Sequence, residues 1–349
     1  MAQTLNGTVL TEHQILGVSA AEISTSCLSI IGASSIIISS LWKKKVRQPE
    51  VHPIFHLSLA DLLASLFLLT GCVLYIVDDD RNHYERQCMV VIGLSMTFFL
   101  CTFLLTLTYA IEVYIRMKER LNRKPMRESI YGHFPSVYAL YVLSWIVPVF
   151  CAAFFLIFSL KNYPTIQKLN GTDCQNFECV LLVHHRSKQC APEVEHRMYL
   201  VSKLIFLFPL LVSLTGNLVL YFLTHRALKQ MHVSSGVVGP RQYIDAARVR
   251  NRAILYCSMF CICWLPSVTL GLVSFTNGFN MQSYYWLYIV QACTTPLQGL
   301  LNCIVYGWQR RGFQIAFNIK RQHTQIEKFQ SLSVSGDSLL SGYSTFSSI

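Results

Sequence analysis

Seven apolar stretches, each about long enough to cross a bilayer, set the fold class of this chain of 349 residues. The hydrocarbon core of a membrane is ~30 Å thick, and an α-helix needs roughly 20 residues to cross it. Backbone amides in lipid must be paired internally, so each stretch is predicted to be a helix. The fold expected is therefore an all-α bundle of seven transmembrane helices, at residues 20–42, 53–77, 88–115, 134–160, 199–224, 251–275 and 283–308.

The basic residues indicate how this bundle crosses the membrane. Of the 29 lysines and arginines, 21 fall in the loops and the tail that would share one side. Loops rich in Lys and Arg stay in the cytoplasm, so the N-terminus is expected outside and the C-terminus inside. The net charge of +11 is divided among several loops and is not gathered on one soluble face. We therefore interpret it as a topology signal and expect no nucleic-acid binding.

One membrane domain accounts for most of the chain. Residues 1–19 are expected to form an extracellular N-terminus, and residues 20–308 the seven-helix domain. A membrane-proximal basic segment follows at 309–330, and residues 331–349 form a Ser/Thr-rich cytoplasmic tail that is expected to be disordered. No basic region precedes the first apolar run, so no cleavable signal peptide is expected. The plasma membrane is the expected location, with an internal or ciliary membrane as the alternative.

Residues on the predicted outer side indicate modification. Asn6 and Asn170 each begin an Asn-Gly-Thr acceptor for glycosylation, and both fall on that side. The outer side is oxidising, so cysteines there can form disulfides. Four of them qualify, at Cys88, which opens the third span, and in the following loop at Cys174, Cys179 and Cys190. We expect Cys88 to pair with Cys179, and Cys174 and Cys190 remain alternatives because sequence cannot choose among pairings.

Charged residues inside the hydrocarbon region are costly and usually functional. Asp61 is the deepest acid of the second span, and Asn302 in the seventh span is its expected neighbour. The pair is a candidate sodium site, and the plain alternative is an acid that is only hydrogen-bonded. Lys203, near the outer end of the fifth span, can meet an anionic ligand or extend its amine to the interface. No organic cofactor is expected.

Prolines predict bends in three spans. Pro148, Pro209 and Pro266 each remove a helical hydrogen bond in mid-span. In the run Cys263-Trp264-Leu265-Pro266, a large indole precedes such a bend. A ring at a hinge can couple the outer cavity to the inner half of the helix, although a tryptophan at this spacing more often only packs.

In this order, the motifs resemble those of G-protein-coupled receptors, on the rhodopsin-like and cyclic-AMP-receptor-like side. The resemblance covers nearly all of residues 20–315, and it rests on the stretch 57–63 around Asp61, Cys88, Trp145, Pro209, the run 263–266 and the run 302–306. It implies a receptor-like bundle. The switch that it implies consists of Trp264, Pro266, Asn302 and Tyr306.

The chain also departs from that pattern at the predicted inner end of the third span. Receptors of this type carry an acid-arginine-tyrosine triplet there, and this chain has Glu112-Val113-Tyr114. Arg116 follows two residues later and is expected to point to a different face. The Asn-Pro pair of the seventh span is here Asn302 followed by cysteine. Glu112, Val113, Tyr114 and Arg116 are therefore a coupling surface in which conventional G-protein activation is altered.

The preferred hypothesis is an orphan receptor-like signal transducer. Its ligand is extracellular or lipid-accessible and unknown, and its partner is a heterotrimeric G protein or another cytosolic transducer. The alternative is a non-signalling membrane scaffold or trafficking protein. An enzyme is not expected, because the spans lack the clustered His and acidic ligands of a zinc hydrolase. A transporter would have repeats or broken helices, and the sequence indicates neither.

Overall fold

The computed structural model describes the helical part of the chain, at residues 10–42, 51–77, 85–121, 137–154, 156–157, 193–233, 240–276 and 280–308. Regular structure within these ranges is helical, without strands. Six helices in this part are long and apolar enough to cross a membrane. The protein is therefore an all-helical, multi-pass membrane protein, as the sequence predicts.

The six long helices coincide with the first six predicted spans and in several cases extend beyond them. They are α1 (Glu12–Trp42), α2 (His52–Val77), α3 (Glu85–Leu121), a helix at Val137–Phe154, α5 (Glu193–Val233) and α6 (Pro240–Val273). With 41 and 34 residues, α5 and α6 are much longer than the roughly 20 residues that a bilayer requires. Both are therefore long enough to continue beyond the apolar layer.

The predicted seventh span is broken. After the short 3-10 helix η2 (Gln282–Tyr284), α7 covers Tyr285–Thr294 and α8 covers Gln298–Trp308. The break contains Pro296, which has no backbone N–H and therefore cannot donate a helical hydrogen bond. With 10 and 11 residues, neither helix is long enough to cross a bilayer by itself. The expectation that no span is broken is wrong at this point.

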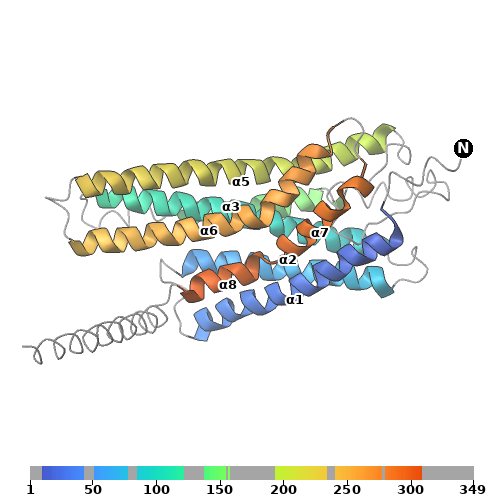
Figure 1. Cartoon of the computed structure of the whole chain (residues 1–349), viewed down its shortest axis with the longest axis horizontal. Coiled ribbons are helices and arrows are strands. Elements are labelled where there is room, and N and C mark those ends of the chain that lie inside the picture. Colours follow the sequence, from blue (N-terminus) through green and yellow to red (C-terminus); the bar gives the residue numbers. More distant parts are fainter. Residues whose placement is uncertain are drawn as a thin grey trace, which may run out of the picture. The chain divides into compact units, whose positions relative to one another are not determined.

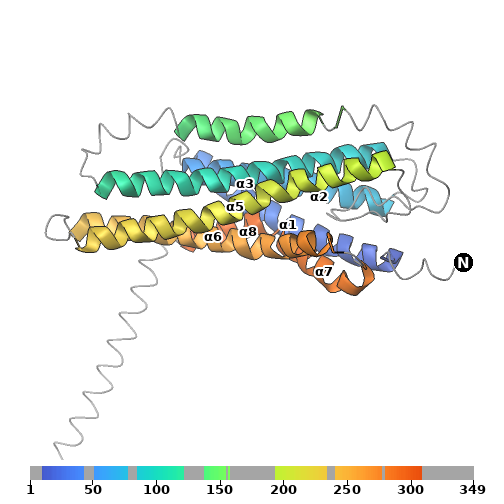
Figure 2. The same cartoon turned by 90° about the horizontal axis from the view of Figure 1, so that it is seen from above.

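Helices that follow one another in the chain also pack together. α1 contacts α2, α2 contacts α3, α3 contacts α5, and α5 contacts α6, while α1 and α6 both contact α7. The two views show these helices side by side (Figures 1 and 2). Tyr141 of the helix at Val137–Phe154 is buried against Leu57 of α2 and Leu105 of α3. The contacts from α1 through α6 to α7 thus close a ring around a common interior.

The interior is filled by aromatic and aliphatic side chains from α2, α3, α5 and α6, with Trp264 as the largest fully buried residue. Many large apolar side chains instead point outward, among them Ile31, Phe150, Phe208 and Phe222, each at least 66% exposed. Such a surface would be unfavourable in water and is favourable against lipid.

The three prolines for which bends are predicted all lie inside helices. Pro209 lies inside α5 and Pro266 inside α6. Figure 1 shows α6 changing direction in its second half. Pro148 lies within the helix at Val137–Phe154, which continues through it.

The chain divides into two compact units, residues Met1–Cys303 and Ile304–Ile349. Of the second unit, only residues 304–308 at the end of α8 are described, and Tyr306 is among them. The predicted basic segment at 309–330 and the tail at 331–349 lie outside the described residues. The residues of the candidate functional site belong to the first unit.

Candidate functional site

Asp61 is buried where α2, α3 and α8 meet. Asp61 is only 2% exposed, and both of its carboxylate oxygens accept hydrogen bonds. Asn302 donates from Nδ2 to Oδ2 at 2.8 Å, and Thr102 donates from Oγ1 to Oδ1 at 3.2 Å. Three helices are thus joined through one carboxyl group, in a low-dielectric interior that strengthens such bonds.

The structure brings Asp61 and Asn302 together, but a cation would have to compete for them. The amide of Asn302 presents its nitrogen to Asp61, whereas a sodium ion would require its oxygen. Groups of three or more His, Cys, Asp or Glu side chains that could hold a metal are absent from the described ranges. The contacts present therefore fit a hydrogen-bonded acid better than an ion site, and the sodium site stays a prediction.

Small residues bring α1 close to α2 and α8 beside Asp61. Ser65, one turn after Asp61, donates to Ser29 of α1 at 3.0 Å between the two hydroxyl oxygens. A Cβ added to Gly32 would lie 2.6 Å from the Cα of Leu300, and one added to Gly299 would lie 2.5 Å from the hydroxyl of Ser29. Only glycine permits backbones to approach so closely. The position of α8 beside Asp61 therefore depends on both glycines.

Trp264 joins α6 to the break between α7 and α8. Its indole Nε1 donates to Oε1 of Gln298, the first residue of α8, at 2.6 Å. One turn further along α6, the hydroxyls of Ser267 and Thr295 lie 3.0 Å apart. The other side of the indole packs edge-to-face against Phe103, with ring centres 4.5 Å apart. The proline-containing part of α6 and the break in the predicted seventh span are thus held together by two hydrogen bonds.

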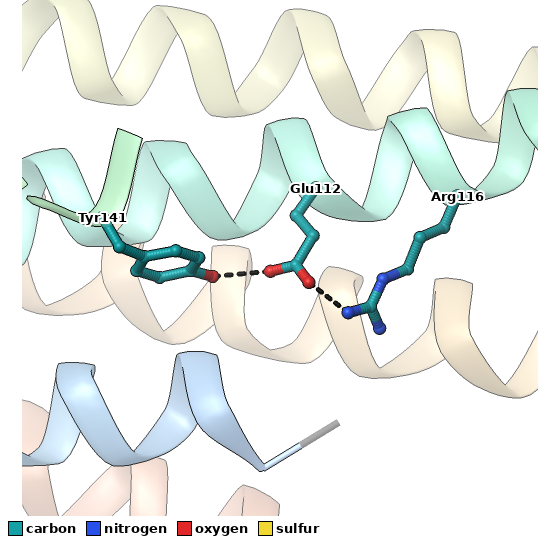
Figure 3. A network of polar contacts seen from close by, with 3 residues as sticks. All are labelled: Glu112, Arg116 and Tyr141. Atoms are coloured by element: carbon teal, nitrogen blue, oxygen red, sulfur yellow. Dashed lines mark hydrogen bonds and ion pairs between the residues drawn. The ribbon is translucent and has the colours of Figure 1, made fainter. Parts of the chain in front are cut away.

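The acid at the predicted inner end of α3 forms a compact network (Figure 3). Glu112 forms an ion pair with Arg116, one turn further along α3. Tyr141, on the helix at Val137–Phe154, donates its hydroxyl to Glu112 Oε2 at 2.6 Å. Arg116 therefore shares the face of Glu112, while Val113 is buried and Tyr114 is half-buried. The acid has an arginine partner even though the position after it is valine.

Sequence reasoning missed an aromatic layer next to this network. The Nε2 atoms of His52 and His56 lie 3.2 Å apart at the start of α2, and Trp145 donates from Nε1 to Nδ1 of His56 at 3.3 Å. The ring of His52 meets that of Tyr141 edge-on, with centres 5.1 Å apart. The spacing of the histidines, four residues on one helix, was the available signal. The layer ties the start of α2 to the helix at Val137–Phe154.

Sequence reasoning also missed a second buried acid. Glu22 of α1 is 1% exposed, and its Oε2 accepts a hydrogen bond from the thiol of Cys72 on α2 at 3.1 Å. The signal was present, since residue 22 falls inside the predicted first span. It was masked by the many apolar neighbours of this single charge.

The remaining predicted site residues are only partly described. Cys88 is buried, and Lys203 places its amine 4.3 Å from the ring centre of Phe275 on the adjacent turn that follows α6. The other residues of the expected disulfide and glycosylation sites lie outside the described residues, namely Asn6, Asn170, Cys174, Cys179 and Cys190. Those modifications stay predictions.

Known proteins place the chain in a family. Residues 18–329 match the family model described as transmembrane protein 116. Curated relatives from Dictyostelium discoideum include cyclic AMP receptor-like protein A, 26% identical over 284 residues, which are 81% of this chain and 62% of that protein. Cyclic AMP receptor-like protein C is 22% identical over 268 residues, 74% of this chain and 63% of that protein. The matches thus cover less than two thirds of either relative.

These matches confirm the resemblance that the motifs indicate. The similarity to cyclic AMP receptor-like proteins spans most of the helical part of the chain, and the family match extends from the first span to beyond α8. We conclude that the chain belongs to the transmembrane protein 116 family.

Proposed function

We propose that this protein is a ligand-responsive, receptor-like signal transducer. It crosses the membrane seven times with its N-terminus outside, and α7 and α8 together form the seventh span. Similarity to two cyclic AMP receptor-like proteins supports the receptor class, although at 22–26% identity it supports no particular ligand. The plasma membrane is the proposed location, because an extracellular ligand must reach the bundle from outside.

The observation that carries this proposal is the bond from Trp264 to Gln298. Near it, α6 lacks a backbone hydrogen bond at Pro266, and the adjacent span is broken at Pro296. The proline-containing turn of α6 and the break between α7 and α8 therefore lie at one level. Hydrogen bonds of 2.6 and 3.0 Å join them. A ligand that moves α7 changes the geometry of α6. It shifts the equilibrium only by the difference in its affinity for the two states.

The inner ends of α5 and α6 supply the surface for a cytosolic transducer. Both helices exceed the thickness of a bilayer, and Arg226 and Lys229 near the end of α5 are exposed. A basic surface attracts an acidic partner over a range of about 8 Å at physiological salt. A heterotrimeric G protein or another cytosolic transducer is the proposed partner, and Val113 makes its mode of binding differ from that of conventional receptors.

A second candidate is a scaffold or trafficking protein that has kept the bundle and lost coupling. The network at Glu112 favours it. Arg116 and Tyr141 hold the acid within the membrane domain, and the buried Val113 offers no charge to a partner. In this case the α6 hinge would be a packing feature only.

Nucleotide exchange on a panel of G-protein heterotrimers tests the proposal. The full chain would be reconstituted in lipid nanodiscs as wild type, Val113→Arg and Trp264→Phe, with Thr70→Ala on the exposed face of α2 as the control. Exchange above background that Trp264→Phe changes and Thr70→Ala leaves unchanged is the expected result. Activity in Val113→Arg alone would indicate a bundle that switches without native coupling. Silence of every form favours the scaffold.

A further inference from the structure

Glu22 is buried in the membrane domain away from the Asp61 site. The residue is 1% exposed, and the thiol of Cys72, a weak donor, approaches its Oε2 at 3.1 Å. Acidic side chains at membrane depth are rare and mark binding or transport sites. Glu22 is not one of the residues of the proposed switch around Trp264. Its surroundings therefore need an explanation of their own.

Two contacts fix the level of Glu22 relative to α7. A Cβ on Gly17 would lie 2.8 Å from the hydroxyl oxygen of Tyr285, and Thr25 donates from Oγ1 to the carbonyl of Ala292 at 2.9 Å. Glu22 lies between Gly17 and Thr25 on α1, and α1 and α7 lie side by side (Figures 1 and 2). It is therefore level with the stretch of α7 just before Ala292, which includes the buried Gln291.

Gln291 has no hydrogen-bond partner within the described residues. It is 2% exposed, and both its amide nitrogen and its amide oxygen lie buried and unsatisfied. The hydroxyl of Ser26, one turn after Glu22 and equally buried, is in the same condition in this part of the structure. Buried polar groups are almost always paired, so unpaired ones indicate an exchangeable water or a ligand. A buried carboxyl group and a hydroxyl of α1 thus lie at about the same level of the bundle as a carboxamide of α7.

The chemistry of these groups selects an organic cation. Glu22 offers one negative charge, while Gln291 offers an acceptor and a donor together. A hard metal ion prefers several oxygen ligands and is not coordinated by a thiol or by an amide nitrogen. Tyr284, Tyr285 and Tyr288 pack around the apolar cluster at this end of α7, and aromatic faces attract cations.

We propose that Glu22, Gln291 and Ser26 form a binding site, between α1, α2 and α7, for a small organic ammonium that also carries a hydroxyl group. The ammonium donates to Glu22 and to the oxygen of Gln291, and the hydroxyl accepts from the nitrogen of Gln291. This site would define the ligand class of the proposed receptor. It rests on the proposed function, because the ligand is taken to enter from outside. Binding itself requires no transducer, so the two proposals fail separately.

Calorimetric titration of the full chain in nanodiscs tests this site. The probes are phenylethanolamine and 1-phenyl-1,2-ethanediol, in which a hydroxyl replaces the ammonium. We expect the wild type to bind the first and not the second. Glu22→Gln should weaken binding at least about 30-fold, as loss of a desolvated charge pair does. Gln291→Leu should weaken it about 3- to 10-fold, as loss of hydrogen bonds does. Ser24→Ala, on the exposed face of α1, should bind like the wild type.

A second readout distinguishes loss of the binding site from misfolding of a variant. Gln291→Leu removes unsatisfied polar atoms, so its ligand-free form should have a higher Tm than the wild type. Equal binding of the two probes, binding of neither, unchanged binding in Glu22→Gln, or a lower Tm in ligand-free Gln291→Leu would each overturn the site. Ammonium binding without nucleotide exchange would leave the site standing and count against the transducer.

Discussion

The middle of the bundle and the predicted inner end of α3 use polar contacts in different ways. In the middle, Trp264 bonds to Gln298 and Asp61 bonds to Asn302, so each bond joins two different helices. At the predicted inner end, the ion pair of Glu112 with Arg116 lies within one helix, and the bond from Tyr141 ties that pair to one neighbouring helix. A bond between helices changes when the helices move, whereas a bond within a helix moves with it. We therefore expect the middle to respond to a ligand and the network at Glu112 to remain a local brace.

The largest expected difference concerns Trp264. Trp264→Ala removes a fully buried indole and its bond to Gln298, and should lower the free energy of unfolding by about 3–5 kcal/mol. Trp286, which is 63% exposed, provides the matched control, and Trp286→Ala should cost less than about 1 kcal/mol. Equilibrium unfolding in mixed micelles measures both. Equal losses would contradict the central place given to Trp264.

The next effect concerns the Asp61 contacts. Asp61→Leu leaves the amide of Asn302 and the hydroxyl of Thr102 buried without their acceptor, and should cost about 1–3 kcal/mol. Asp61→Asn keeps an acceptor and should cost less. A double-mutant cycle with Asn302→Leu should give a coupling of at least about 0.5 kcal/mol. Strict additivity would show that the contact between α2 and α8 contributes nothing.

The glycine contact between α1 and α8 sharpens the comparison further. Gly32→Ala would place its Cβ 2.6 Å from the backbone of Leu300 and should destabilise the protein by about 1–3 kcal/mol. Gly307→Ala has nothing within 4 Å of the added Cβ and should be neutral or stabilising by up to about 1 kcal/mol. Thermal unfolding of the two variants side by side is the measurement. Similar Tm values would mean that α1 and α8 are not held so closely.

The smallest effects are expected at the inner end. Arg116→Met breaks an ion pair of the i,i+4 type in which the arginine side chain is 30% exposed but the glutamate side chain only 10%. Because the buried carboxylate keeps its hydrogen bond from Tyr141, the loss should be about 1 kcal/mol. Tyr141→Phe removes a buried hydrogen bond to Glu112 and should cost about 1 kcal/mol. Unfolding curves at low and at high salt would measure both. A loss above 2 kcal/mol in Arg116→Met would make this network as important as the middle.

The sequence predicts the positions of the six long helices well, because length and hydropathy are local properties. It missed the break at residues 295–297 because the surrounding run is long and mostly apolar, although Pro296 stands in it. The neighbourhood of Asp61 and Asn302 was expected because both are polar residues inside apolar spans, while the bond of Tyr141 to Glu112 depends on how two helices pack. Glu22 was overlooked because one charge in a long apolar run hardly changes its average. Contacts between helices are the part that sequence patterns leave open.

The most direct test is the distance between the predicted inner ends of α3 and α6. Spin labels at Lys118 and Asn251, both exposed, would be introduced as unnatural residues so that the native cysteines stay unlabelled. Pulsed electron resonance in nanodiscs would compare the wild type, Gln298→Leu and Thr70→Ala. Release of the Trp264 bond should add a second, distinct distance in Gln298→Leu alone. One identical distance distribution in all three proteins would contradict a hinge that is controlled by this bond.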